Sequence, residues 1–217
     1  MGNEVRRCVI ISAAPNSDLS FFKSELSDDD FVICADGGYI YAQRFGIKPQ
    51  LIVGDFDSST MPDTDVPTIA LPTEKDDTDT IYAIKQGISR GYDDFVLLAA
   101  SGGREDHSYA NYSALLYLKH RKCTGKILTK NSKVFILENE ETELLGLNGK
   151  SFSIFPFAGS SCVVTLEGFY YPLSDYNLSA DFPLGVSNII ISDSARVSVK
   201  KSAAIIYIAD REVNDTN

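Results

Sequence analysis

The sequence contains no tryptophan, only two histidines and only four cysteines among its 217 residues. The cysteines, Cys8, Cys34, Cys123 and Cys162, form no C-x-x-C pair, and three of them lie in apolar runs. This spacing argues against a cysteine-built zinc site and against a disulfide framework, and it predicts buried thiols in a reducing compartment. We therefore expect a cytoplasmic protein.

Two further absences narrow the class of protein. No run approaches the ~20 apolar residues that a membrane-spanning helix needs, and the first 15 residues predict a strand rather than a signal peptide. There is no long block of lysine or arginine, and the formal net charge is −10. Because such a surface repels phosphate backbones, we expect no nucleic-acid partner, and because no long apolar run is present, we expect no membrane partner.

Strand-like and helix-like runs alternate over the first 123 residues. Near-continuous apolar runs predict strands that are buried on both faces, as in a parallel sheet. These runs cover residues 9–13, 31–35, 51–53, 68–71 and 95–100, and helices are predicted over residues 39–45, 77–90 and 106–121. The alternation predicts an α/β domain over residues 1–123.

The pattern changes after Cys123. Short strands separated by turn residues are predicted, with no helix, over residues 126–129, 134–137, 151–155, 163–166, 188–191, 197–199 and 203–208. This pattern favours an all-β sandwich over residues 124–217. The expected fold class is therefore an N-terminal parallel-sheet α/β domain followed by a C-terminal all-β sandwich domain.

Acidic and glycine-rich clusters follow four of the predicted strands of the first domain. They begin at Asp36-Gly37-Gly38, Gly54-Asp55, Thr73-Glu74 and Ser101-Gly102. Because the carboxyl ends of parallel strands share one edge of a sheet, and ligands bind at that edge, we expect the four clusters to converge.

A metal site is predicted among these acids. Asp55 and Asp57 are two residues apart, so in extended chain both side chains project to the same side. Neighbouring carboxylates repel each other unless a cation neutralises them, and Mg²⁺ commonly takes one or two carboxylates plus substrate phosphates. A solvated acidic turn is the alternative for this pair. Asp79 is a candidate third metal carboxylate, or a group that orients an attacking hydroxyl.

The residues before the second predicted helix have several possible roles. Asp76 or Asp77 could cap the helix, since an acid there accepts hydrogen bonds from free N–H groups. Asp76 and Asp79 are three residues apart and would share one side of the first turn. Lys75 lies beside them and could contact a phosphate.

The segment Gly102-Gly103-Arg104 has the composition of a phosphate-binding loop. Glycines allow backbone N–H groups to approach an anion, and arginine adds forked donors. A tight turn is an equally good interpretation. Asp106 is expected near a helix start, in a capping role, and His107 is more readily interpreted as structural than as a base.

Taken together and in order, these segments resemble the motifs of the thiamine pyrophosphokinase family. The matching segments are Ala35–Gly38, Gly54–Ser58, Lys75–Asp79, Gly102–His107 with Asn111, Gly168–Leu173 and Gly185–Asn188. The resemblance implies an α/β domain followed by a β-sandwich, and a homodimer with thiamine held between domains of different subunits. It also implies a Mg²⁺-dependent transfer of the terminal diphosphate of ATP to the hydroxyl of thiamine, with release of AMP.

The resemblance implies roles for single residues. Asp55, Asp57 and Asp79 match metal or phosphate-site acids, and with Asp76 they form the predicted catalytic set. The predicted nucleotide- and substrate-binding residues are Asp36, Gly37, Lys75, Thr78, Gly103, Arg104, Asp106, His107, Asn111, Ser187 and Asn188. Ser187 matches a residue beside thiamine. Residues 12–15 depart from the family, because many relatives have glycines there. Without tryptophan, the candidates to contact the thiamine ring are Tyr170 and Tyr171, and core packing is the expected role of at least one of them.

Two other classes of function stay open on these residues. A Mg²⁺-dependent nucleotide-sugar transferase or a phosphohydrolase could use the same D-x-D acids. A non-catalytic module that binds nucleotide or thiamine is the other alternative, and the four intact acidic motifs count against it.

Overall fold

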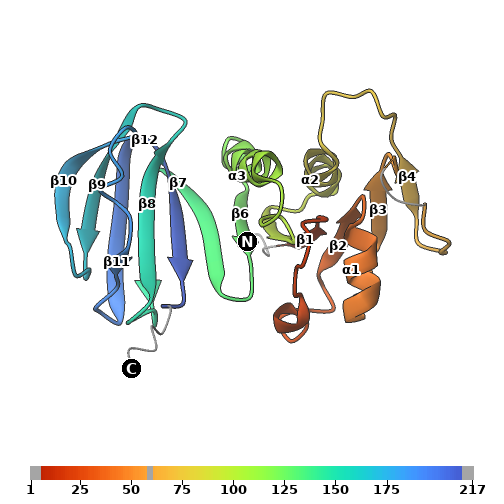
Figure 1. Ribbon diagram of the computed structural model, residues 1–217, viewed down its shortest axis with the longest axis horizontal. Helices are drawn as coiled ribbons and strands as arrows, with labels where there is room; N and C mark the ends of the chain where they lie inside the picture. Colours follow the sequence, from red (N-terminus) through yellow and green to blue (C-terminus); the bar gives the residue numbers. More distant parts are fainter. Residues whose placement is uncertain (1–5, 58–60, 212–217) are drawn as a thin grey trace. The chain divides into compact units, whose positions relative to one another are not determined.

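A computed structural model describes residues 6–57 and 61–211 (Figure 1). The chain divides into two compact units, Met1–Lys130 and Asn131–Asn217. The sequence placed the boundary earlier, after residue 123. The difference comes from β6 (Thr124–Leu128), which pairs in parallel with β5 (Asp94–Leu98). The prediction that residues 126–129 form a strand of the second domain is therefore wrong, since β6 completes the sheet of the first unit.

The first unit is built on a parallel sheet. Its strand order is β6-β5-β1-β2-β3-β4, and every neighbouring pair runs in parallel. The remaining strands are β1 (Arg7–Ile11), β2 (Phe31–Ala35), β3 (Leu51–Gly54) and β4 (Thr68–Ala70). The chain adds strands in one direction from β1 to β4 and then crosses back to β5. Ligands of open α/β sheets bind at the carboxyl ends of the strands near such a reversal.

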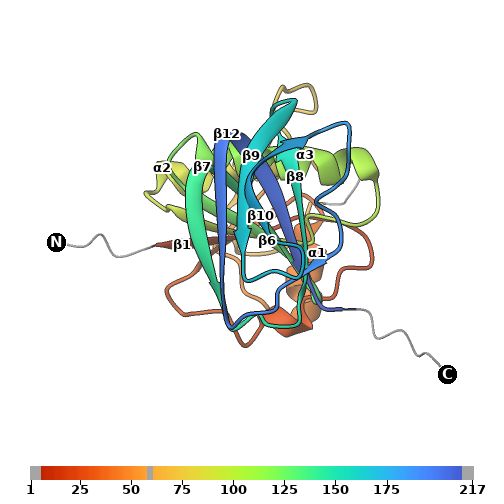
Figure 2. The same cartoon turned by 90° about the vertical axis from the view of Figure 1, so that its left-hand side faces the viewer.

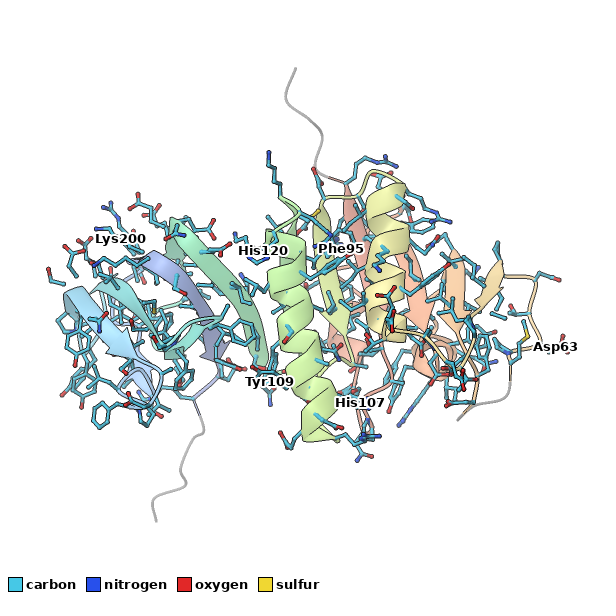
Figure 3. The ribbon with its side chains drawn as sticks, turned by 90° about the horizontal axis from the view of Figure 1, so that it is seen from above. Asp63, Phe95, His107, Tyr109, His120 and Lys200 are labelled. Atoms are coloured by element: carbon cyan, nitrogen blue, oxygen red, sulfur yellow. The ribbon has the colours of Figure 1, made fainter. Side chains whose placement is uncertain are left out.

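Helices cover both faces of this sheet. One face carries α1 (Gly38–Phe45) and a short 3₁₀ helix (Ser20–Phe22), and the other carries α2 (Asp79–Ser89) and α3 (Glu105–Lys119) (Figure 1). Figure 3 shows α2 and α3 side by side over the sheet. The three predicted helices are confirmed, with ends that differ by a few residues.

The two faces of β1 show why the sheet is stable. Val9 and Ile11 are fully buried and belong to the core that includes Phe22, whereas Cys8 lies toward α2. The helix approaches so closely there that a Cβ on Gly87 would lie 3.0 Å from the Cys8 Sγ atom. Burying each large apolar side chain contributes about 1.5–3 kcal/mol, so both faces of the strand must be apolar.

The second unit is a β-sandwich made by two long bent strands and their neighbours (Figure 2). Its strands are β7 (Ser132–Leu145), β8 (Ser151–Phe157), β9 (Ser161–Glu167), β10 (Leu173–Ser179), β11 (Asn188–Ile189) and β12 (Ser194–Ala209). One edge of β12 pairs with β7 along its length, and the other edge pairs first with β9 and then with β8. The pairing shifts between Val199 and Ala203, where a bulge bends the strand. The separate strands predicted over 197–199 and 203–208 are thus one bulged strand.

The expected fold class, an α/β domain followed by a β-sandwich, is confirmed. Among the described residues, no helix is both long enough and apolar enough to cross a membrane.

Candidate active site

Three carboxylates from separate stretches of chain meet at the carboxyl edge of the parallel sheet. Asp36 follows β2, Asp55 follows β3, and Asp79 is the first residue of α2. One carboxylate oxygen from each lies within 4.8 Å of the other two, and within residues 6–57 and 61–211 this is the group of acids that could hold a metal ion. We call Asp36, Asp55 and Asp79 the acid cluster. The convergence of these motifs follows from the parallel order of β2 and β3.

The backbone around Asp36 is shaped to bring the cluster together. Asp36 has a left-handed conformation, with φ of 47°, and its N–H donates to the carbonyl oxygen of Val53 over 2.7 Å. Aspartate tolerates this conformation better than most residues. A Cβ on Gly54 would lie 3.0 Å from the Asp36 Cα atom, and a Cβ on Gly38 would lie 1.9 Å from the carbonyl oxygen of Ile11. Glycine at both positions therefore allows close approach.

Lys75 lies against two members of the acid cluster. Its Nζ atom donates to Asp55 Oδ2 over 2.5 Å and lies 3.2 Å from Asp79 Oδ1. The three side chains are only 14%, 11% and 20% exposed, so water screens their charges weakly. The ammonium group offsets part of the negative charge that the cluster concentrates.

The three charged groups have shifted pKa values with different causes. The hydrogen bond from Lys75 holds the pKa of Asp55 below its ordinary value. Burial raises the pKa of Asp79, although attraction to Lys75 partly offsets the rise. Burial by itself would lower the pKa of Lys75, but its interactions with Asp55 and Asp79 outweigh this effect and raise it. Lys75 is therefore positively charged at neutral pH.

The acid cluster fits a divalent cation such as Mg²⁺. Asp79 Oδ1 is buried and accepts no hydrogen bond, because its contact with Lys75 meets the distance of an ion pair but not the geometry of a hydrogen bond. The Lys75 ammonium compensates this buried oxygen only in part, so the oxygen can still accept a ligand cation. Carboxylate oxygens are also the ligands that Mg²⁺ prefers.

Asp57 is not a member of the acid cluster. The chain after β3 is not extended, because Phe56 has a left-handed φ of 55° and the Asp57 N–H donates back to Asp55 Oδ1 over 3.3 Å. The extended backbone expected for this pair is therefore absent. Asp57 is exposed, and its role as a metal ligand stays a prediction. Asp36 takes the third place in the cluster instead.

The start of α2 also differs from expectation. Thr78, and neither Asp76 nor Asp77, caps the helix, and its hydroxyl accepts from the Ile81 N–H over 3.2 Å. Asp77 pairs with Lys85 at 2.6 Å, and Asp76 is exposed just before the helix. Asp76 is therefore open to a ligand, whereas Asp77 has a structural partner.

A pair of buried hydroxyl groups supports the same helix turn. Ser12, just after β1, and Thr80, next to Asp79, are 6% and 7% exposed, and their hydroxyl oxygens are 3.0 Å apart. The hydrogen bond joins the end of β1 to the first turn of α2 and so helps to position Asp79. Sequence reasoning missed this contact, since no local pattern connects residues so far apart.

The loop after β5 is exposed. Gly102 and Gly103 have φ of 87° and 101°, and a Cβ on Gly103 would lie 2.4 Å from Pro15 Cδ. Arg104 forms an ion pair with Asp106 at 2.6 Å, and the two side chains are 72% and 65% exposed. The Arg104 hydrogen bond lowers the pKa of Asp106 to about 2. This loop therefore presents charged groups to solvent.

The first turn of α3 places the other predicted residues of this motif. His107 is exposed at the amino end of α3, and it and Tyr109 lie on opposite sides of the helix (Figure 3). Asp106 lies in the first turn, where its Oδ1 accepts from the His107 N–H over 3.0 Å, so it is not the cap of the helix. The Asn111 amide donates to the carbonyl oxygen of Ala100 over 2.8 Å and holds the loop after β5 against α3.

In the second unit, the predicted pair Ser187-Asn188 has two different environments. Asn188 is buried, accepts from the Tyr171 N–H over 3.0 Å and donates to the Tyr171 carbonyl oxygen over 2.8 Å. Ser187 is exposed and has a left-handed φ of 59°. Asn188 thus fixes the backbone beside the exposed rings of Tyr170 and Tyr171, so the expectation that at least one of these rings packs in the core is wrong. Ser187 is available to a ligand.

Comparison with known proteins identifies the family. The profile of the thiamin pyrophosphokinase catalytic domain matches residues 22–127, and that of the thiamin pyrophosphokinase vitamin B1 binding domain matches residues 135–206. The two matches follow each other along most of the chain. This chain belongs to the thiamin pyrophosphokinase family. It is accordingly a kinase-type enzyme of that family, and the D-x-D alternatives are not favoured.

Relatives of the family share both sequence and fold with this chain. Thiamine pyrophosphokinase from Bacillus subtilis (strain 168) is 24% identical over 204 residues, which cover 91% of this chain and 95% of that protein. The crystal structure of the enzyme from B. subtilis matches with a TM-score of 0.84 at 22% identity, over 94% of this chain and 99% of that one. Thiamin pyrophosphokinase from Candida albicans matches with a TM-score of 0.77 at 18% identity, over 94% and 90%. Bacterial and fungal members of the thiamin pyrophosphokinase family thus have this two-part fold.

Proposed function

We propose that this chain transfers the terminal diphosphate of ATP to the hydroxyl of thiamine, giving thiamine diphosphate and AMP in a Mg²⁺-dependent reaction. The observation that carries the proposal is the acid cluster, which lies at the carboxyl edge of the parallel sheet. Both family profiles match the chain that contains it. ATP is a polyanion, and an acidic protein needs a cation to bind its phosphates at such a site.

Asp36, Asp55 and Asp79 would hold the Mg²⁺ ion. When bound, the ion would neutralise charge on the phosphates and polarise the phosphoryl group under attack. Asp57 stays a candidate for a further ligand on the strength of the family resemblance. Gly37, between Asp36 and α1, would present its backbone to the nucleotide, and a Cβ there would lie 3.3 Å from the Ala13 Cβ.

The protein's own residues would position the reactants. The hydroxyl oxygen of thiamine forms a bond to the β-phosphorus of ATP, the bond from that phosphorus to the oxygen bridging to the α-phosphate breaks, and AMP leaves with the electron pair. We assign the hydroxyl proton to Asp76, because it is exposed and adjoins Lys75, whereas Asp79 belongs to the cluster. Holding both reactants in line supplies a large part of the rate enhancement in such reactions.

Arg104 and its neighbours would bind the phosphates. The Arg104 guanidinium is exposed and pairs with the exposed carboxylate of Asp106, so it can exchange this partner for a phosphate at little cost. The motif that contains Arg104 also contains Gly103, His107 and Asn111, and Thr78 belongs to the motif before α2. We infer that Gly103 and Thr78 shape the site and that Asn111 supports it.

We propose that the second unit binds thiamine and forms a homodimer. Several large apolar side chains of this unit are exposed, among them Tyr170, Tyr171, Phe182, Leu184 and Val186. Exposed apolar side chains in one region support a role in binding a ligand or a partner. Ser187 directly follows Val186 and is exposed. We also propose a cytoplasmic location, supported by four cysteines that are all free and buried.

The test is a reaction of the full chain with ATP, MgCl₂ and thiamine, followed by mass analysis of the products. We expect thiamine diphosphate and AMP in equal amounts, and no product in excess EDTA. Free phosphate or a glycoside would instead support a phosphohydrolase or a sugar transferase. Tight binding of ATP or thiamine without turnover would support a non-catalytic module.

A further inference from the structure

The position of Lys75 differs from the one expected from the sequence. The sequence suggested a contact with substrate phosphate, whereas the ammonium group lies 2.5 Å from Asp55 Oδ2 and 3.2 Å from Asp79 Oδ1. The side chain is 14% exposed, and its terminal group is directed into the acid cluster rather than toward solvent. Its contacts are therefore with the groups that would hold the metal.

The charge of the acid cluster explains why an ammonium group is stable there. Asp36, Asp55 and Asp79 place their oxygens within 4.8 Å of one another, and like charges so close and so poorly solvated repel strongly. A single ammonium shared by Asp55 and Asp79 removes part of this repulsion. Because this needs no bound ligand, Asp55 and Asp79 can keep their arrangement in the metal-free protein.

We propose that Lys75 is the internal counter-ion of the acid cluster, and that it positions Asp55 and Asp79 in the metal-free enzyme and competes with the divalent cation for their oxygens. Lys75 is then a positioning residue that sets how tightly the cation binds before nucleotide arrives. The competitive part of this inference rests on the proposed function, because it assumes that the cluster binds a divalent cation.

The chain offers a matched control for this role. Lys85 lies on α2 and forms an ion pair at 2.6 Å with Asp77, just before the start of this helix. The pair is outside the acid cluster, and the Lys85 side chain is 44% exposed. Lys75→Met and Lys85→Met remove the same charge and the same donors from side chains of equal length. Any difference between the variants therefore reports on the acid cluster.

The experiment measures two quantities for the wild type, Lys75→Met, Lys75→Arg and Lys85→Met. The first is the thermal midpoint in EDTA. The second is the dissociation constant for Mn²⁺, used as the probe without nucleotide and followed by its electron paramagnetic resonance signal. We expect Lys75→Met to lower the midpoint by roughly 4 °C and to tighten Mn²⁺ binding about tenfold, because repulsion rises and the competing cation is gone. Lys75→Arg should resemble the wild type, and Lys85→Met should change neither quantity appreciably.

Each outcome decides one part of the inference. Equal midpoints for Lys75→Met and Lys85→Met in EDTA would overturn the counter-ion role. Unchanged or weaker Mn²⁺ binding by Lys75→Met would overturn the competition, and an effect seen only with ATP present would assign Lys75 to the phosphates instead. If Lys75→Met does not fold, Lys75→Gln provides the same Mn²⁺ comparison. If the wild type binds no Mn²⁺ with or without ATP, the metal site of the proposed function fails, and the EDTA comparison alone then accepts or rejects the counter-ion role.

Discussion

Two groups of charged side chains at the carboxyl edge of the sheet differ sharply in burial. The acid cluster and Lys75 are largely buried, with Asp55 11% and Asp79 20% exposed, whereas Arg104 and Asp106 are 72% and 65% exposed. Buried charges interact strongly and need fixed partners, while exposed ones are screened and can change partners freely. The comparison indicates that the protein fixes the acid cluster and Lys75 in advance and leaves the pair of Arg104 and Asp106 open to solvent.

The largest difference between the buried and the exposed group is expected when one charge is removed from each. Asp55→Asn keeps the shape of the side chain but removes a ligand of the cluster, so we expect kcat to fall by at least about 10²–10³-fold. Asp106→Asn should lower the rate much less, because its carboxylate is solvated. AMP formation measures both rates, and circular dichroism checks that both variants are folded. Near-normal turnover by Asp55→Asn would show that the cluster does not take part in the reaction.

A second test compares two glycines, Gly38 close to Asp36 and Gly102 in the exposed loop before Arg104. Gly38→Ala would place a Cβ 1.9 Å from the Ile11 carbonyl oxygen, so the backbone next to Asp36 must shift. We expect the free energy of unfolding to fall by about 3 kcal/mol. Gly102→Ala has open space but a φ of 87°, and should cost only about 1–2 kcal/mol. Urea denaturation measures both, and equal losses would argue against a rigid backbone beneath the cluster.

A third test addresses the support of Asp79. Thr80→Val removes the hydrogen bond to Ser12 and leaves a buried hydroxyl without its partner, which should cost about 1–3 kcal/mol. Ser12→Ala combined with Thr80→Val should cost less than the two single changes added together. Urea denaturation of the single and double variants gives the coupling, and strict additivity would show that the two hydroxyls do not interact.

The smallest effect is expected at the exposed end. Arg104→Ala should leave the thermal midpoint close to that of the wild type, because its ion pair with Asp106 is screened by water. It should raise KM for ATP roughly tenfold by removing a forked phosphate donor. Initial rates at varied ATP concentration test this. A large loss of stability with no change in KM would show that Arg104 stabilises the fold and does not bind ATP.

Much of the fold could be predicted because burial on both faces leaves a direct trace in the sequence. The apolar runs of β1, β2, β3 and β5 stand out for that reason. The boundary at residue 123 could not be found in this way, since β6 is only partly buried and resembles the strands of the sandwich. The bulge in β12 likewise gave the pattern of two strands.

The candidate site was predictable as a set of motifs but not as a geometry. Parallel strand order brings Asp36, Asp55 and Asp79 to one edge, as the sequence indicated. The expected pairing of Asp55 and Asp57 assumed an extended backbone, and the left-handed Phe56 could not be foreseen from residue types. The ion pair of Lys75 with two of the acids depends on how α2 packs on the sheet, which no local pattern reports.

The most direct measurement is the anomalous scattering of Mn²⁺ in crystals grown with a non-hydrolysable ATP analogue. We predict one strong peak bonded to carboxylate oxygens of Asp36, Asp55 and Asp79, and its loss in Asp55→Asn. A peak bound elsewhere, with these three side chains unaltered around Lys75, would contradict it.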